Sequence, residues 1–208
     1  MGRVGRIDSG GSRGIAGRMP RALATLGFAL VLLLAWSAAA HAASASVVYH
    51  GSTARKQIAL TFDDNTNSSR GVATLRALQK YKVRATMFVI GQGVKAYPSI
   101  NNEIVKGMAA GLFEVGDHSW SHPVLTKLST SGMRSQIGGG TDAFREATGA
   151  RTVPLFRPPY GSNNSTVAAV AGSEGFSHLV LWDIDPRDWA GGSARAIADH
   201  IVSRAHNG

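Results

Sequence analysis

The sequence contains no cysteine. This absence excludes a disulfide framework, and it removes the thiolate as a metal ligand or nucleophile, so that any metal site has to use histidine, aspartate and glutamate. There is also no Lys- or Arg-rich run, which argues against nucleic-acid binding in spite of a formal net charge of +9. Charged residues make up only 17% of the chain, but hydrophobic residues reach 44%, which excludes wholesale disorder.

The length of 208 residues is enough for one domain with a sizeable core and short for two. No internal repeat and no Pro- or Ser-rich linker divides the chain. From Ala43 onward there are 17 Lys and Arg against 12 Asp and Glu, a net charge of +5. This excess suits a solubilising surface, and it would also favour anionic cell-wall polymers.

The N-terminus has the pattern of a secretory signal peptide. A basic stretch leads into the apolar run 22–36, and small residues follow up to Ala40-His41-Ala42, an A-x-A cleavage pattern. We therefore expect a signal peptide over residues 1–42, a single domain over 43–208, and a secreted or cell-envelope protein. The alternative is an uncleaved membrane anchor over 22–40, which is near the minimum length of a span.

Apolar runs of strand length alternate with helix-period segments along the rest of the chain. The predicted strands are 58–62, 85–90, 112–115, 155–156 and 178–182. The predicted helices are 71–81, 99–110, 129–148, 166–174 and 193–205, the third of them weakened by three consecutive glycines. This alternation predicts an α/β fold, a parallel sheet with helices outside it. Periodicity alone leaves an open doubly wound sheet and a barrel as alternatives.

Polar clusters follow four of the predicted strands. They are Asp63-Asp64, His118 with His122, the turn Arg157–Gly161, and Asp185 with Asp188-Trp189. In both candidate folds ligands bind beyond the carboxyl ends of the strands, where distant segments converge. This convergence favours a functional site at that rim more strongly than any single motif does.

The aspartate and histidine clusters suggest metal chemistry. Two neighbouring carboxylates raise the pKa of one of them unless a cation relieves the repulsion, and two imidazoles with one carboxylate form a common zinc set. The alternatives are a solvated turn or helix cap at Asp63-Asp64 and hydrogen-bonded loop histidines at His118 and His122. Pro123 biases His122 toward an extended conformation, so we expect these histidines in a loop or at a helix end.

The segment Arg157–Gly161 (RPPYG) predicts a rigid turn, because proline fixes φ and glycine relaxes it. Arg157 has the geometry to hold a carboxylate through a bidentate pair. Tyr160 and Trp189 are candidates for the wall of a sugar pocket. A purely structural turn and ordinary aromatic packing are the alternatives.

Taken together, the motifs resemble the polysaccharide deacetylases of carbohydrate esterase family 4. The resemblance covers residues 58–189 and follows the first four signature motifs of that family in order: TFDD (61–64), HSWSH (118–122), RPPYG (157–161) and DPRDW (185–189). It implies a distorted (β/α) barrel with parallel strands and outer helices, which binds zinc or a similar divalent ion. Four motifs in register are far more specific than any one of them.

The resemblance also implies roles for individual residues. Asp64, His118 and His122 match the metal ligands, and Asp63 matches the general base that Arg157 orients. By the same correspondence the Tyr160 N–H is an oxyanion donor, Asp188 tethers the catalytic acid of the family, a histidine, and Trp189 forms a pocket wall. The implied activity is hydrolysis of the acetamide of an N-acetylated polysaccharide such as peptidoglycan or a chitin-like chain.

Two departures from the family pattern bear on activity. Asn65 replaces the glycine that usually follows the aspartate pair, and the fifth motif, a final apolar strand ending in Leu-x-His, is absent. His200 and His206 fall in or after the last predicted helix, so we expect an incomplete barrel that is truncated before the last motif and lacks the acid histidine. The readings left open are an N-acetyl deacetylase, an O-acetyl xylan esterase and a carbohydrate-binding pseudoenzyme, none with a nucleic-acid partner and each with membrane contact only through the leader.

Overall fold

The computed structural model describes residues 43–64 and 68–208. The predicted signal peptide, its cleavage point after Ala42, the alternative anchor and Asn65 therefore lie outside the described residues. No helix within the described ranges has the length and apolar content needed to span a membrane.

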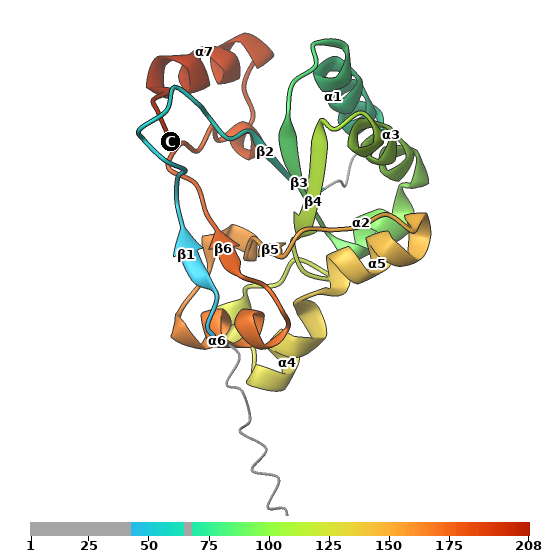
Figure 1. Ribbon diagram of the computed structural model, residues 1–208, viewed down its shortest axis with the longest axis vertical. Helices are drawn as coiled ribbons and strands as arrows, with labels where there is room; N and C mark the ends of the chain where they lie inside the picture. Colours follow the sequence, from blue (N-terminus) through green and yellow to red (C-terminus); the bar gives the residue numbers. More distant parts are fainter. Residues whose placement is uncertain (1–42, 65–67) are drawn as a thin grey trace, which may run out of the picture. The chain divides into compact units, whose positions relative to one another are not determined.

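The centre of the domain is a sheet of six parallel strands that curls into part of a barrel (Figure 1). Its spatial order is β1-β6-β5-β4-β3-β2, so β1 and β2 are the edges of the described sheet. The strands are β1 (Ser46–Val48), β2 (Thr61–Asp64), β3 (Ala85–Val89), β4 (Phe113–Asp117), β5 (Leu155–Phe156) and β6 (His178–Val180). This arrangement confirms the predicted α/β class and the incomplete (β/α) barrel.

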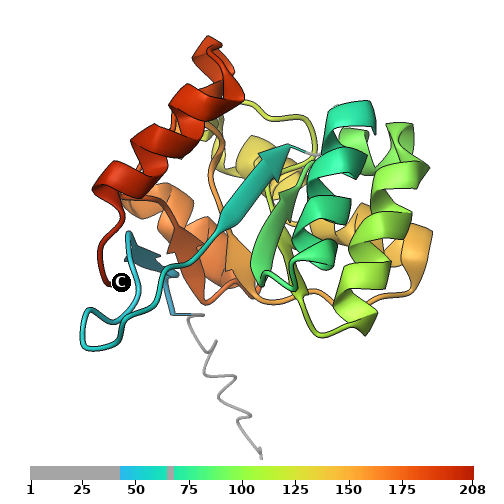
Figure 2. The ribbon, with the colours of Figure 1, turned by 90° about the horizontal axis from the view of Figure 1, so that it is seen from above.

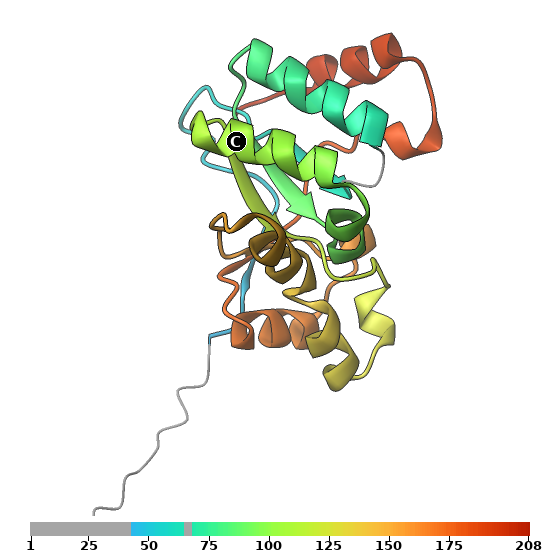
Figure 3. The same ribbon diagram turned by 90° about the vertical axis from the view of Figure 1, so that its right-hand side faces the viewer.

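The helices lie outside the curled sheet. They are α1 (Ser68–Lys80), α2 (Gly91–Ala96), α3 (Pro98–Ala109), α4 (Thr130–Gln136), α5 (Gly139–Thr148), α6 (Ser165–Ser173) and α7 (Ala194–Arg204), with 3₁₀ turns η1 (Leu125–Lys127), η2 (Pro159–Gly161) and η3 (Asp188–Ala190). Figure 3 shows α1 and α3 side by side. Seen from above, β2 lies between α1 on one side and α7 on the other (Figure 2).

Two apolar clusters form the core. One is built on β3, β4, α1 and α3 and contains Val89, Ile100 and Ile104; the other is built on β5, β6, α4 and α6 and contains Phe156 and Leu179. Each of these side chains is almost fully buried and stabilises the fold by about 1.5–3 kcal/mol relative to an exposed position. The inward periodicity predicted for the helices over 71–81 and 99–110 is confirmed.

The structure corrects several predicted boundaries. The strand predicted at 58–62 begins at Thr61, because only Thr61–Asp64 pair with β3, and Ile58 is exposed. The helix predicted at 129–148 is two helices, since Gly138 has φ 90° between α4 and α5. The strand β1 and the helix α2 were not predicted, because segments of three and six residues carry too little periodicity.

Candidate metal centre

The predicted site residues converge at the carboxyl ends of the strands. Asp63 and Asp64 are the last two residues of β2, so they lie within the strand, whereas the sequence predicted them beyond its end. His118 directly follows β4, and Arg157 directly follows β5. Because β2, β3, β4 and β5 are neighbours in one parallel sheet, their ends bring these side chains together.

Asp64, His118 and His122 form a cluster with ligand atoms within 4.8 Å of one another. The Nε2 atoms of both histidines lie 3.5 Å from Oδ1 of Asp64. Ligand atoms bound tetrahedrally at about 2.0–2.1 Å from a zinc ion are about 3.4 Å apart, so this spacing suits such an ion. Oδ1 of Asp64 is buried and accepts no hydrogen bond from the described residues. The three side chains therefore fit a divalent cation.

The two imidazoles are suited to metal binding as neutral rings. Nδ1 of the buried His118 donates a hydrogen bond to the backbone carbonyl of Arg157, at 2.6 Å, which leaves the lone pair of Nε2 directed at Asp64. Burial and the neighbouring His118 hold the pKa of His122 below its ordinary value, although Asp64 and Asp63 act in the opposite direction. A lowered pKa favours the neutral imidazole that ligates a metal.

Asp63 lies beside the ligand cluster and is held by Arg157. Nη1 of the buried Arg157 donates to Oδ1 of Asp63, at 2.8 Å, and to Oγ1 of Thr61. The other carboxylate oxygen, Oδ2, lies 3.9 Å from Nε2 of His118. The two adjacent carboxylates therefore have different partners. Asp63 pairs with Arg157, and Asp64 lies next to the two histidines. The structure brings together the predicted base, its predicted partner and the three predicted ligands.

Strained backbone concentrates around this cluster. Residues other than glycine with positive φ include Asp64 at 77°, Ser119 at 73°, His122 at 62°, Tyr160 at 59° and Arg187 at 54°. Each such residue costs about 1–3 kcal/mol and persists only where its surroundings hold it. The histidines lie in a loop as predicted, but the extended conformation expected of His122 is wrong, because the 3.0 Å hydrogen bond from its N–H to Oγ of Ser119 closes a tight turn.

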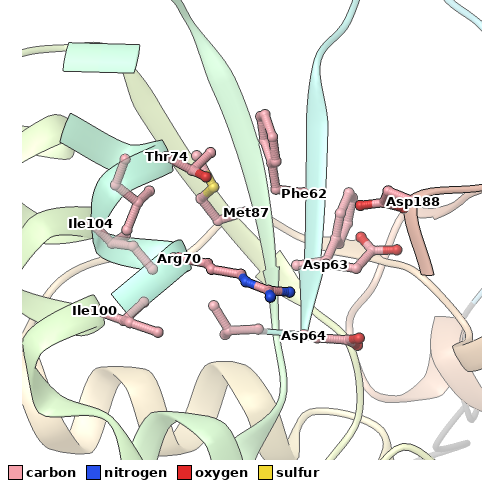
Figure 4. Close-up of a pocket in the computed structure, with 13 residues that line it drawn as sticks. Phe62, Asp63, Asp64, Arg70, Thr74, Met87, Ile100, Ile104 and Asp188 are labelled. Carbon is pink, nitrogen blue, oxygen red and sulfur yellow. The ribbon is translucent and has the colours of Figure 1, made fainter. Parts of the chain in front are cut away.

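The aromatic residues and Asp188 stand at the margin of the cluster. The Tyr160 ring contacts the His122 ring edge to face, with centroids 4.5 Å apart, and is 66% exposed. Asp188 lines a cavity of about 280 Å³ together with Asp63 and Asp64 (Figure 4). Trp189 is 74% exposed and does not line that cavity.

No described histidine hydrogen-bonds to Asp188. Its Oδ1 accepts instead from the N–H of Trp189, at 3.1 Å. His200 lies within α7, and His206 follows that helix and pairs with Asp183, Nε2 to Oδ2, at 3.2 Å. Neither histidine lines the cavity that Asp188 shares with Asp63 and Asp64.

The sequence analysis missed two contributors to the site, Thr61 and Asp117. Thr61 shares Nη1 of Arg157 with Asp63. Asp117 is fully buried at the end of β4 and accepts backbone N–H groups of the helix α5. Burial raises the pKa of its carboxyl, while those N–H groups act to lower it. The signal in the sequence is weak, because the strand FEVGD also carries the exposed charge of Glu114.

The fold and the cluster together define an α/β half-barrel whose rim carries a His/Asp cluster that fits a divalent cation. The family model of polysaccharide deacetylases matches residues 50–179, more than half of the chain. The chain therefore belongs to the polysaccharide deacetylase family, and the resemblance drawn from its four motifs is confirmed.

Relatives of known description agree with this assignment. The chain is 39% identical over 154 residues to the peptidoglycan-N-acetylmuramic acid deacetylase PdaC of Bacillus subtilis, which covers 74% of this chain and 31% of the relative. It is 32% identical over 158 residues to a bifunctional xylanase/xylan deacetylase of Cellvibrio japonicus, covering 76% of this chain and 23% of that protein. The chain thus spans a third or less of the length of these two relatives.

A solved structure supports the fold directly. A mutant of BA3943 from Bacillus anthracis, a pseudoenzyme of carbohydrate esterase family 4 with restored enzymatic activity, aligns with a TM-score of 0.68 and 28% identity. The alignment covers 80% of this chain and 59% of that one. The half-barrel is therefore the fold of this carbohydrate esterase family.

Proposed function

We propose that this chain is the deacetylase domain of a metal-dependent enzyme that removes acetyl groups from N-acetylated polysaccharide of the peptidoglycan or chitin type. The observation that carries the proposal is the ligand cluster of Asp64, His118 and His122 beside an aspartate held by Arg157. The description of PdaC as a peptidoglycan deacetylase supports this substrate class. The hydrolase would act on a non-peptide C–N bond.

Zinc is the metal that we propose, because two neutral imidazoles and one carboxylate leave an open position for water in many catalytic zinc sites. A divalent ion held by Asp64, His118 and His122 would supply two kinds of chemistry, a lowered pKa of its bound water and polarisation of the acetyl carbonyl oxygen. The residues of the chain carry out the remaining steps. One set of residues acts on the attacking water and the acetyl carbonyl, and another would act on the departing amine.

Asp63 is the proposed general base. Arg157 occupies its Oδ1 through a 2.8 Å hydrogen bond, which leaves Oδ2 to take the proton of the attacking water. Tyr160 has a left-handed backbone conformation in the turn η2. Its N–H is the proposed hydrogen-bond donor to the oxyanion, which forms on the carbonyl oxygen of the acetyl group. The exposed rings of Tyr160 and Trp189 are proposed to contact the sugar.

The second half of the reaction needs a general acid, and no histidine among the described residues hydrogen-bonds to Asp188. The departing amine has to be protonated, and a general acid typically contributes about 10² to 10⁴ in rate. Asp188 faces the same cavity as Asp63 but contacts no imidazole among the described residues. We therefore propose slow release of acetate from N-acetyl substrates by this chain alone.

Two other functions have support from particular observations. An O-acetyl esterase is favoured by the similarity to a xylan deacetylase, because an ester has a better leaving group and needs less help from an acid. A carbohydrate-binding pseudoenzyme is favoured because no histidine in residues 43–64 and 68–208 hydrogen-bonds to Asp188, and because the chain is similar to a family member described as a pseudoenzyme.

Secretion is part of the proposal and rests on the leader. The A-x-A pattern at Ala40–Ala42 predicts that the exported protein begins at Ala43. N-terminal sequencing of exported protein tests this start. An intact leader on a membrane-bound product would identify the leader as an anchor.

Acetate release from defined polymers tests the proposed function. The zinc-loaded chain is incubated with a chitin oligomer, with peptidoglycan and with O-acetylated xylan, next to an Asp63→Asn variant that keeps the ligand cluster. We expect slow release from the N-acetylated polymers by the wild type and none by the variant. Release from xylan alone would identify an esterase, and binding of the polymers without any release would identify a pseudoenzyme.

A further inference from the structure

The segment that carries two of the proposed ligands is a loop, so its conformation is not fixed by the hydrogen bonds of a helix or a strand. It runs from His118 to His122 after the end of β4, and two of its residues, Ser119 and His122, have left-handed backbone conformations. A segment of this kind keeps its shape only if other parts of the chain tie it down. The contacts that do so are therefore part of the metal centre.

The side chain of Asp117 makes the central tie. Its Oδ2 accepts the N–H of Ser119 and the N–H of Gly138, both at 3.0 Å, and its Oδ1 accepts the N–H of Thr141 at 2.9 Å. Ser119 belongs to the ligand segment, whereas Gly138 and Thr141 belong to the start of α5. One carboxylate thus joins the segment to a helix whose N-terminal dipole favours a negative charge.

The backbone of Asp117 adds a second link to the site. Its carbonyl accepts the N–H of Arg157 at 2.9 Å, and the carbonyl of Arg157 in turn accepts Nδ1 of His118. Asp117 therefore has contacts with the segment, with α5 and with the residue that holds Asp63. It is 0% exposed, so water does not compete for these hydrogen bonds.

The outer side of the segment is held independently. The N–H of Trp120 donates to the carbonyl of Gln136, and the N–H of Ser121 donates to Oε1 of the same residue, each near 3 Å. These bonds fix the middle of the segment against the end of α4. They do not reach Ser119, whose N–H depends on Asp117.

We propose that Asp117 is a positioning residue of the metal centre, which sets the orientation of His118 and His122 by tying their segment to the N-terminus of α5. Its side chain makes no hydrogen bond to Asp64, His118 or His122, because its partners are Ser119, Gly138 and Thr141. The inference rests on the proposed function, because it assumes that a divalent ion binds at this cluster. It goes beyond that function in assigning the geometry of the site to a residue outside the four motifs.

The test compares Asp117→Asn and Asp117→Ala with the wild-type chain. Asp142→Asn is the matched control, because Asp142 lies in the first turn of the same helix, is exposed and pairs with Arg145 only. Three quantities are measured on the full chain: zinc affinity by competition with a chelator, the visible spectrum of the cobalt-substituted protein, and urea unfolding of the metal-free protein. The cobalt spectrum reports coordination geometry, which a purely structural role would leave unchanged.

We expect Asp117→Ala to bind zinc about 10- to 100-fold more weakly and to shift the cobalt bands, as outer-shell substitutions typically do. Asp117→Asn should fall between alanine and wild type. Its amide oxygen can take the place of Oδ2 and keep the bonds to Ser119 and Gly138, but its NH₂ group then faces the N–H of Thr141. Asp142→Asn should match the wild type in all three measurements.

Wild-type zinc affinity and an unchanged cobalt spectrum in the folded variants would overturn the inference, even if their stability falls. If Asp117→Ala does not fold, Asp117→Asn decides by the same two measurements. A wild-type chain that binds neither zinc nor cobalt would refute the proposed function, and this inference with it. The two failures are therefore distinguishable.

Discussion

At the scale of single residues, Arg157 connects the site to the sheet. Its guanidinium donates to Asp63 and Thr61 on one side and to the carbonyls of Val180 and Leu181 on the other. It also lies over the Phe88 ring, 4.3 Å from its centroid. A planar, five-donor group suits this position, and the compact ammonium of lysine does not.

We predict that Arg157→Lys lowers the rate of acetate release about 10- to 100-fold, because Asp63 loses the donor that orients it. It should also lower the free energy of unfolding by about 1–3 kcal/mol, since buried carbonyls lose their donors. Acetate assays and urea unfolding check both effects. Arg151→Lys, at an exposed position, is the control, and equal losses in the two variants would contradict a role for Arg157 in orienting the base.

At the scale of elements, the start of α5 is shaped to approach the site. Gly138 has φ 90°, Gly139 lies against Trp120, and a Cβ on Gly140 would come within 1.9 Å of the Val89 carbonyl oxygen. That oxygen accepts the N–H of His118 at 2.9 Å. These glycines would weaken an isolated helix. They are required here because Gly138 adopts a positive φ, and because α5 packs so closely against β3 and the ligand segment that a Cβ on Gly139 or Gly140 has no room.

We predict that Gly140→Ala destabilises the fold by about 1–3 kcal/mol or more and weakens zinc binding, because the backbone at Val89 has to move and His118 moves with it. Thermal unfolding and zinc titration are the measurements. Gly132→Ala in α4 is the control, since its Cβ would lie 3.3 Å from Cβ of Leu128 and 3.4 Å from Oγ of Ser129, both far looser than the 1.9 Å at Gly140, and alanine favours a helix by up to about 1 kcal/mol. Unchanged zinc affinity in Gly140→Ala would argue against this coupling.

The elements with strong apolar periodicity were predictable from the sequence, and those defined by contacts were not. The helix α3 and the strand β3 were predicted to within a residue or two. Ile100 and Ile104 recur with the period of a helix, and Val89 ends a largely buried run of strand length. The break at Gly138 was missed, since its reason lies in the approach of α5 to residues distant in sequence.

The same division holds within the site. Asp63, Asp64, His118, His122 and Arg157 were predictable because their motifs follow strands that share one rim. Asp117 was not, because the N–H groups of Gly138 and Thr141 that its carboxylate accepts lie more than twenty residues away in the sequence and belong to no motif.

At the scale of the whole molecule, the described domain brings the proposed metal ligands together but places no histidine in hydrogen-bond contact with Asp188. The edge strand β2 carries Asp63 and Asp64, and Asp188 lines the same cavity and hydrogen-bonds to no histidine among the described residues (Figure 4). An unpaired edge of this kind also favours association with other chains. This arrangement should affect the rates of acetate release from N-acetylated and O-acetylated substrates differently.

We predict that free imidazole accelerates acetate release from a chitin oligomer and leaves release from O-acetylated xylan nearly unchanged. The amine leaving group needs protonation, whereas the alcohol leaves with less help, and imidazole can enter beside Asp188 and supply the proton. Rates measured over a range of imidazole concentrations, with Asp188→Asn as the control, provide the check. Fast N-deacetylation without imidazole would show that a residue already present, such as His206, acts as the acid.

Asp64, His118 and His122 form the proposed metal centre, and the zinc content of purified protein tests it most directly. Elemental analysis should find close to one zinc per chain in the wild type and a large loss in both His118→Ala and His122→Ala, because each removes one of three ligand atoms. His178→Ala, at a histidine that pairs with Ser46 away from the cluster, should keep its zinc. Full zinc retention in both ligand variants would contradict the account.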